Sequence, residues 1–141
     1  MINYLNLEGK IAVMTNVVFD TSVLLAIFQG EVGAEEALEY LPYSMMSYVN
    51  ISEVIYVLVR NNIELMDARS QALRIIAKAV PYDEDQAVVA AAFKTMTKMK
   101  GISLGDCACL ALGYIHKCKI ITADKNWKKL GIDGLNIEFI R

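Results

Sequence analysis

The chain has 141 residues and a mass of 15.7 kDa, which fits one domain whose core folds without disulfide or metal staples. Apolar residues make up 55% of it, so we expect a helix-rich α/β core and a further apolar surface for a partner. No apolar run approaches the roughly 20 residues that span a bilayer, and no secretory signal is recognisable, so we expect a cytoplasmic protein with no membrane partner.

The first predicted strand and helix meet at Asp20. Residues 17–19 are apolar and end at this carboxylate, and the apolar run at 23–28 predicts a helix that stops near Gly30. Ligands of α/β sheets bind at the carboxyl ends of the strands. Asp20 is therefore either a cap of the helix that follows or part of a site.

The segment before this strand is predicted to be an N-terminal extension, residues 1–13, followed by one domain at 14–141. Residues 11–13 alternatively lengthen the first strand. No function is apparent in the extension.

A second capped helix is predicted from Asn50 and Glu53, which have the spacing of a capping box with Asn50 at the cap. Ser103 and Asp106 form a similar box before an apolar helix. Residues 119–124 repeat the opening pattern, an apolar strand that ends in a carboxylate, Asp124. The remaining predicted elements are helices at 31–41, 64–79 and 85–98, a short helix through Trp127, and extended segments at 43–47, 80–82 and 135–140. Strands that alternate with helices predict a three-layer α/β/α fold with a mostly parallel central sheet.

Four of the sixteen acids lie at helix starts or strand ends beside apolar sequence: Asp20, Glu53, Asp106 and Asp124. Each alone can be explained as a cap, but in a parallel sheet such corners face one edge. Carboxylates gathered at one edge raise each other's pKa unless cations are present. Mg²⁺ or Mn²⁺ prefers oxygen ligands, so the pattern indicates a divalent-metal site that activates water for phosphoryl displacement.

Four segments of the sequence resemble the PIN domain family and, within it, the VapC-like toxins of bacterial and archaeal toxin–antitoxin pairs. They are residues 17–26 (VVFDTSVLLA), 49–54 (VNISEV), 103–107 (SLGDC) and 121–127 (ITADKNW). The resemblance extends over about residues 14–140. It implies a PIN-like fold and a Mg²⁺- or Mn²⁺-dependent endoribonuclease that forms a homodimer and is silenced by a cognate antitoxin.

The resemblance also implies roles for individual residues. The catalytic, metal-binding acids would be Asp20, Glu53, Asp106 and Asp124, and the polar residues that support them would be Ser22, Asn50 and Thr122. On this interpretation three aspartates hold the metal directly. Glu53 either ligates it or orients and deprotonates the attacking water.

Charge is distributed unevenly along the chain. Residues 1–93 hold 12 acidic and 5 basic side chains, whereas residues 94–129 hold 8 lysines and 2 acids. The basic segment is either a solvated surface or the contact for the phosphate backbone of RNA, for which Lys125, Lys128 and Lys129 are the candidates.

Two other functions are compatible with acids at a sheet edge. A receiver-type signalling domain would need a close acidic pair after the first strand, and Asp20 stands alone there. A PIN-like domain that binds RNA or protein without catalysis is the second alternative, and the presence of all four acids argues against it.

Overall fold

The computed structural model describes residues 2–5, 11–14 and 16–141, with side chains from residue 16 onward. Five strands form one sheet in which every neighbouring pair is parallel. In spatial order they are β5 (Lys78–Val80), β4 (Ser44–Ser47), β3 (Val17–Phe19), β6 (Lys119–Thr122) and β7 (Ile137–Phe139). The prediction of a parallel central sheet is confirmed.

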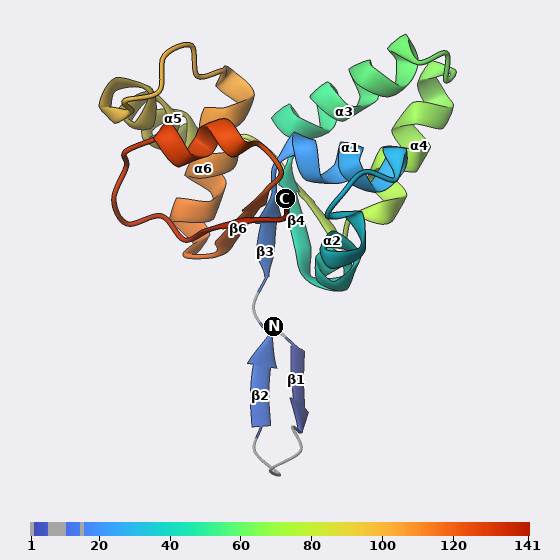
Figure 1. Cartoon of the computed structure of the whole chain (residues 1–141), viewed down its shortest axis with the longest axis horizontal. Coiled ribbons are helices and arrows are strands. Elements are labelled where there is room, and N and C mark those ends of the chain that lie inside the picture. The colour runs from blue at the N-terminus through green and yellow to red at the C-terminus, as the bar shows by residue number, and fades with distance from the viewer. Residues whose placement is uncertain (1, 6–10, 15) are drawn as a thin grey trace.

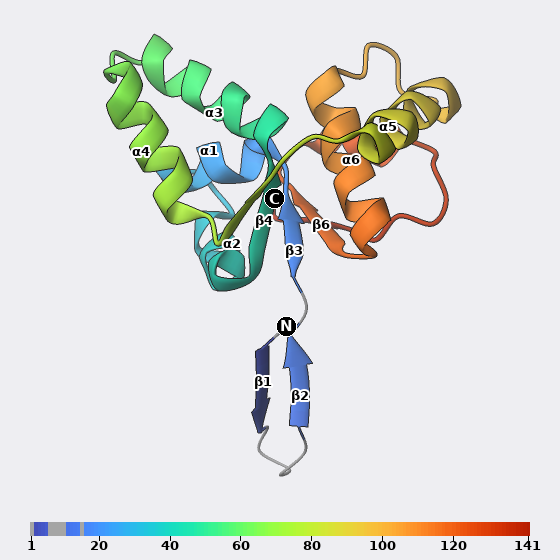
Figure 2. The same ribbon diagram turned by 180° about the vertical axis from the view of Figure 1, so that it is seen from behind.

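Helices cover both faces of this sheet. One layer consists of α1 (Thr21–Gln29), α2 (Ala34–Tyr40), α3 (Tyr48–Arg60) and α4 (Leu65–Ile75), with the short 3-10 helix η1 (Leu41–Tyr43). The other consists of α5 (Glu84–Met96), α6 (Leu104–His116) and the 3-10 helix η2 (Lys125–Lys129). The two layers lie on opposite sides of the strands in Figure 1 and in the reverse view of Figure 2. This is the expected α/β/α architecture.

Alternation along the strands builds a separate core on each face. Val17 and Phe19 pack with α1, α3 and α4, whereas Val18 between them packs with α5 and α6. Successive side chains of a strand point to opposite faces, so a fully buried strand must be apolar throughout. This explains why residues 17–19 show no polar alternation.

Two short strands precede the domain. β1 (Ile2–Leu5) and β2 (Ile11–Met14) pair antiparallel in a sheet of their own. Residues 11–13 therefore do not lengthen β3, and that alternative is wrong.

The predicted start of α3 and the predicted end of α4 differ from the structure. α3 begins at Tyr48, because Ser47 caps it by accepting a hydrogen bond from Val49 N at 3.1 Å. The predicted capping box of Asn50 and Glu53 is therefore wrong, and both residues lie within the helix. The helix predicted at 64–79 ends at Ile75, because the backbone of residues 78–80 pairs with β4 instead. Tertiary pairing outweighs local helix propensity there.

Among the described helices, none combines the length and apolar character that crossing a membrane requires.

Candidate active site

The sheet reverses its strand order beside β3. The chain runs outward from β3 to β4 and β5, then returns to place β6 and β7 on the other side. Numbered along the chain, the five strands lie in the order 3-2-1-4-5, whereas the flavodoxin-like sheets of receiver domains have the order 2-1-3-4-5. The receiver alternative is therefore wrong. Ligands of open α/β sheets bind where the order reverses, which here is between the carboxyl ends of β3 and β6.

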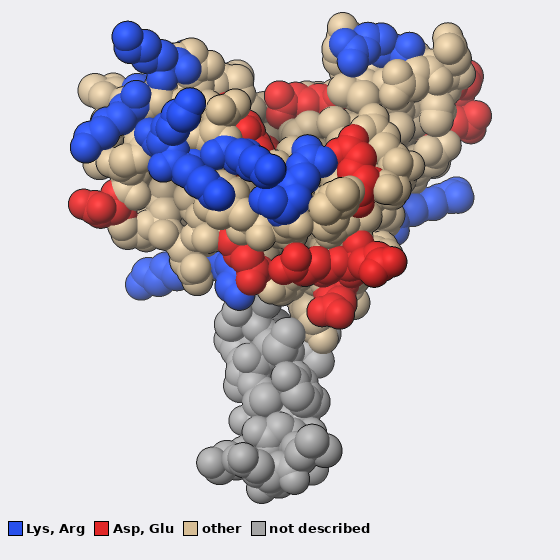
Figure 3. Space-filling model, viewed as in Figure 1, with Lys and Arg blue, Asp and Glu red and all other residues tan. Residues whose placement is uncertain are grey.

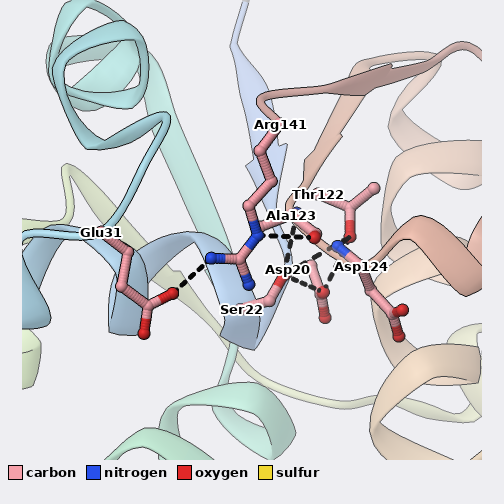
Figure 4. A network of polar contacts seen from close by, with 7 residues as sticks. All are labelled: Asp20, Ser22, Glu31, Thr122, Ala123, Asp124 and Arg141. Carbon is pink, nitrogen blue, oxygen red and sulfur yellow. Dashed lines mark hydrogen bonds and ion pairs between the residues drawn. The ribbon is translucent and has the colours of Figure 1, made fainter.

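Asp20 lies at this reversal point. Its backbone N–H donates to Ile121 O at 3.0 Å, and only 4% of the residue is exposed. Although Asp20 occupies the N-cap position of α1, its side chain accepts no hydrogen bond from the backbone of the helix. Its Oδ2 instead accepts from Ser22 Oγ at 2.7 Å and from Thr122 Oγ1 at 3.0 Å (Figure 4). The interpretation of Asp20 as a helix cap is therefore wrong.

The two hydroxyl groups are themselves oriented by the backbone. Ser22 Oγ accepts from Ala123 N at 2.9 Å, and Thr122 Oγ1 accepts from Asp124 N at 3.0 Å. A hydroxyl that accepts from an N–H directs its own hydrogen elsewhere, in this case at Asp20. The strand ends of β3 and β6 are joined in this way through one carboxylate.

The ionisation of Asp20 is strongly perturbed. Burial raises its pKa to about 6, the hydrogen bonds from Ser22 and Thr122 oppose the rise, and the negative charges of Asp106 and Glu53 add to it. Three of the four predicted acids therefore interact electrostatically. A buried carboxylate under such repulsion gains stability from any cation that binds beside it.

Glu53 reaches the same edge from α3. Its Oε1 accepts hydrogen bonds from Thr21 Oγ1 at 2.7 Å and from Asn50 Nδ2 at 3.0 Å. Asn50 is fully buried and also donates to Gly105 O at 2.9 Å, which joins α3 to the start of α6. A Cβ at Gly105 would lie 2.3 Å from Glu53 Oε1, so any larger residue there would displace this carboxylate.

Asp106 and Asp124 combine their edge position with a capping role. Asp106 and Ser103 form the predicted capping box of α6: Asp106 Oδ2 accepts from Ser103 N at 3.2 Å, and Ser103 Oγ accepts from Asp106 N at 3.0 Å. Asp124 caps η2, with Oδ1 accepting from Asn126 N at 2.9 Å. These bonds use one oxygen of each carboxylate.

The donor chemistry of this edge fits a hard divalent cation, because the four acids offer carboxylate oxygens only. In the described part of the chain, however, no group of three or more Asp, Glu, His or Cys side chains stands arranged to hold one ion. The hydrogen bonds of Glu53 and Asp106 keep these carboxylates in local contacts.

Arg141 is a site neighbour that the sequence analysis missed. Its Nε donates to Ala123 O at 3.1 Å and its Nη1 pairs with Glu31, so it connects the β6–η2 turn to the end of α1 (Figure 4). Thr21 and Gly105 were missed as well, although each is adjacent to a predicted acid. For Arg141 no signal existed, since its partners are 18 and 110 residues away along the chain.

The predicted RNA-binding lysines lie on η2 and are exposed. Lys128 Nζ lies 5.4 Å from the centre of the Phe139 ring. Figure 3 shows basic side chains gathered over the α5–α6 side and centre of one face, with acidic side chains below and beside them. Because Asp124 is the N-cap of η2, the three lysines directly follow one of the four predicted acids.

The protein is thus of the α/β/α class, with a candidate site at the carboxyl ends of its parallel strands. This site consists of a buried carboxylate at the reversal point and further acids at neighbouring helix starts. The family model described as PIN domain matches residues 17–133. The chain belongs to the PIN domain family. A search of curated proteins gave no match.

Several solved structures have the same fold. A toxin–antitoxin complex from Klebsiella pneumoniae is 23% identical with a TM-score of 0.72, and the alignment covers 89% of this chain and 98% of the other. VapBC2 from Rickettsia felis, bound to a promoter DNA fragment, is 16% identical with a TM-score of 0.68, covering 89% and 98%. VapBC-5 from Mycobacterium tuberculosis is 24% identical with a TM-score of 0.59, covering 91% and 99%. At these identities the similarity establishes the fold alone.

Proposed function

We propose that this PIN domain is a Mg²⁺- or Mn²⁺-dependent endoribonuclease and the toxin of a toxin–antitoxin pair. The observation that carries the proposal is Asp20, a buried carboxylate held by two hydroxyls at the strand-order reversal and repelled by Asp106 and Glu53. An aspartate with only a structural role would keep its charge hydrated at lower cost on the surface. A carboxylate kept under this repulsion is typical of a cation site.

In the proposed site Asp20, Asp106 and Asp124 hold the ion, and Ser22 and Thr122 orient Asp20. The ion, when bound, activates water and stabilises charge on the phosphoryl group. Glu53 ligates the ion or takes the proton of the attacking water. Thr21 and Asn50 both donate hydrogen bonds to its Oε1, so these two bonds do not use its Oε2.

RNA would approach over the basic face. Lys125, Lys128 and Lys129 are exposed on η2, whose N-cap is Asp124. Contacts of lysine with phosphates supply affinity that is independent of sequence. The scissile phosphate would thereby be brought to the acids.

The partner proteins would be a second copy of the chain and a cognate antitoxin in the cytoplasm. A toxin–antitoxin complex from Klebsiella pneumoniae and a member of the VapBC family of toxin–antitoxin systems from Mycobacterium tuberculosis share the fold. Apolar side chains are exposed on both layers of this domain, among them Leu65 at 57% and Val88 at 65%. Such surfaces favour protein partners.

Cleavage of structured RNA by the purified protein, with Mn²⁺ or with chelator, tests the nuclease proposal. We expect cutting only with the metal ion, and at least a hundredfold slower cutting by Asp20→Asn, because one ligand is lost. Asp133→Asn is the matched control, since Asp133 is an exposed acid in the loop before β7. It should cut at the wild-type rate.

Two results would contradict the proposal. Equal cutting by wild type and Asp20→Asn would place the chemistry elsewhere. RNA binding without any cutting in Mg²⁺ or Mn²⁺ would support the alternative of a non-catalytic binding module.

A further inference from the structure

A groove of about 410 Å³ lies beside η2, between this helix and the linker that follows α5. Lys98 and Lys100 line it from the linker, and Asn126 and Lys129 line it from η2. All four side chains are exposed. The groove therefore presents three ammonium groups and one amide to solvent, from two segments that are far apart in the sequence.

The linker is held in a defined position against η2. Lys98 N donates to Leu130 O at 2.9 Å, and Thr97 Oγ1 donates to the same oxygen at 3.0 Å. Met99 packs against the core of the α5–α6 layer, while the lysines on both sides of it are exposed. Lys98 is thus held at its backbone, and the side chains of both linker lysines are exposed.

The side chain of Lys98 is also guided along its length. Gly131 has a φ of +66°, and a Cβ there would lie 2.7 Å from Lys98 Cδ and 3.0 Å from Lys98 Cγ. The aliphatic stem of Lys98 therefore lies across the bare backbone of Gly131. An ordered stem loses less conformational entropy when its ammonium group binds a ligand.

None of the groove lysines is neutralised within the described part of the chain. The ion pairs there join Lys119 with Glu138 and Arg141 with Glu31, and none includes Lys98, Lys100 or Lys129. Three uncompensated positive charges around one groove attract a polyanion.

One wall of the groove is η2, the helix that Asp124 caps. Asn126 N donates to Asp124 Oδ1, so one wall of the groove begins two residues from a proposed metal ligand. A chain whose phosphate lay at the acids would run along η2 into the groove. We propose that this groove binds the phosphate backbone of the RNA that flanks the cleavage site, an inference that rests on the proposed nuclease function.

RNA binding in chelator, where no cutting occurs, tests the groove separately from catalysis. Affinity of a labelled single-stranded RNA is measured across a salt series for wild type, for Lys98→Gln with Lys100→Gln, and for Arg74→Gln with Lys78→Gln. The last pair removes the same charge at exposed positions at the end of α4 and in the edge strand β5. Each lost phosphate contact lowers the slope of log affinity against log salt by about 0.7.

We expect the slope to fall by about 1.4 in the groove variant and to remain unchanged in the control variant. Equal slopes for the groove variant and wild type would overturn the proposal, as would absence of RNA binding by wild type at low salt. The affinity of the same proteins for polyglutamate is measured as well. If the groove variant bound RNA like wild type but had lost affinity for polyglutamate, the groove would bind an acidic protein segment, and the RNA proposal would be overturned. If RNA bound through the groove but was not cleaved in Mn²⁺, the proposal for the groove would hold and the proposed nuclease function would be contradicted.

Discussion

At the scale of single residues, Asp20 occupies the position of a helix cap but does not have the hydrogen bonds of one. It stands where a helix cap would stand, yet its hydrogen bonds come from hydroxyls of α1 and β6 rather than from the helix backbone. Burial raises its pKa to about 6, and the charges of Asp106 and Glu53 add to the rise. A folded-state pKa above the unfolded-state value has a measurable consequence for stability.

The metal-free protein should lose stability as the pH rises from about 4 to about 7. In this range the folded state holds a proton on Asp20 that the unfolded state has released, so raising the pH favours unfolding. The shift from 3.8 to about 6 corresponds to about 3 kcal/mol. Asp20→Asn has no such proton, so its free energy of unfolding should exceed that of wild type by a margin that grows with pH.

Urea denaturation of both proteins in chelator, at several pH values, measures this margin. Other titrating groups are common to the two proteins and largely cancel in the difference. A difference that stayed constant between pH 4 and 7 would contradict the assigned environment of Asp20.

At the scale of elements, the site depends on the close approach of α3 and α6. Asn50 and Glu53 are one helical turn apart and face the start of α6, where Asn50 donates to Gly105 O. The carboxylate of Glu53 occupies the space that a side chain at position 105 would fill. The packing of two helices thus decides where this carboxylate lies.

Gly105→Ala should reduce RNA cleavage strongly while changing stability little. The new Cβ forces the end of the Glu53 side chain away from Thr21 and Asn50, whereas alanine in a helix is favoured over glycine by about 1 kcal/mol. Thermal unfolding and cleavage, measured on the same preparation, check both expectations. Cleavage at the wild-type rate would show that Glu53 has no role in that position.

A double-mutant cycle isolates the contact. With Glu53→Ala as the background, the space is empty and Gly105→Ala should stabilise the protein. Destabilisation by Gly105→Ala to the same extent in wild type and in the Glu53→Ala background would contradict both expectations and mean that Gly105 is constrained by something other than Glu53.

At the scale of the whole molecule, the two helical layers expose separate apolar surfaces. One is a groove of about 320 Å³ between α3 and α4, bordered by Leu65 and Met66. The other is a hollow of about 720 Å³ on the opposite layer, bordered by Val88 and Tyr114. Since they lie on opposite sides of the sheet, the second copy and the antitoxin that we propose as partners would not compete for one surface.

The free protein should be a dimer in light scattering at micromolar concentration, and it should co-purify with the product of an adjacent small gene. Leu65→Glu and Val88→Glu place one charge on each surface, at positions exposed to similar extents. Each should abolish one of the two associations and spare the other. A wild-type monomer, or two variants that retain both associations, would contradict this arrangement.

From residue 17 onward the sequence determined the order of strands and helices, because apolar runs and turn residues act over a few positions. Residues 17–19 predicted a buried strand, Ser103 and Asp106 predicted the cap of α6, and both are present. Local patterns also indicated that Asp20 and Asp124 follow strands. The parallel sheet followed from the alternation of elements, and with it the expectation of one shared edge.

Only the tertiary structure decided which groups meet at that edge. Asp20 and Thr122 are 102 residues apart, and Asn50 and Gly105 are 55 apart, so no local signal records their contacts. The error at Asn50 has the same origin: its spacing with Glu53 fits a cap, but Ser47 at the end of β4 is the residue that the fold places at the helix start. Long-range pairing of the strands fixed the hydrogen-bond partners, and these partners determine what each carboxylate can do.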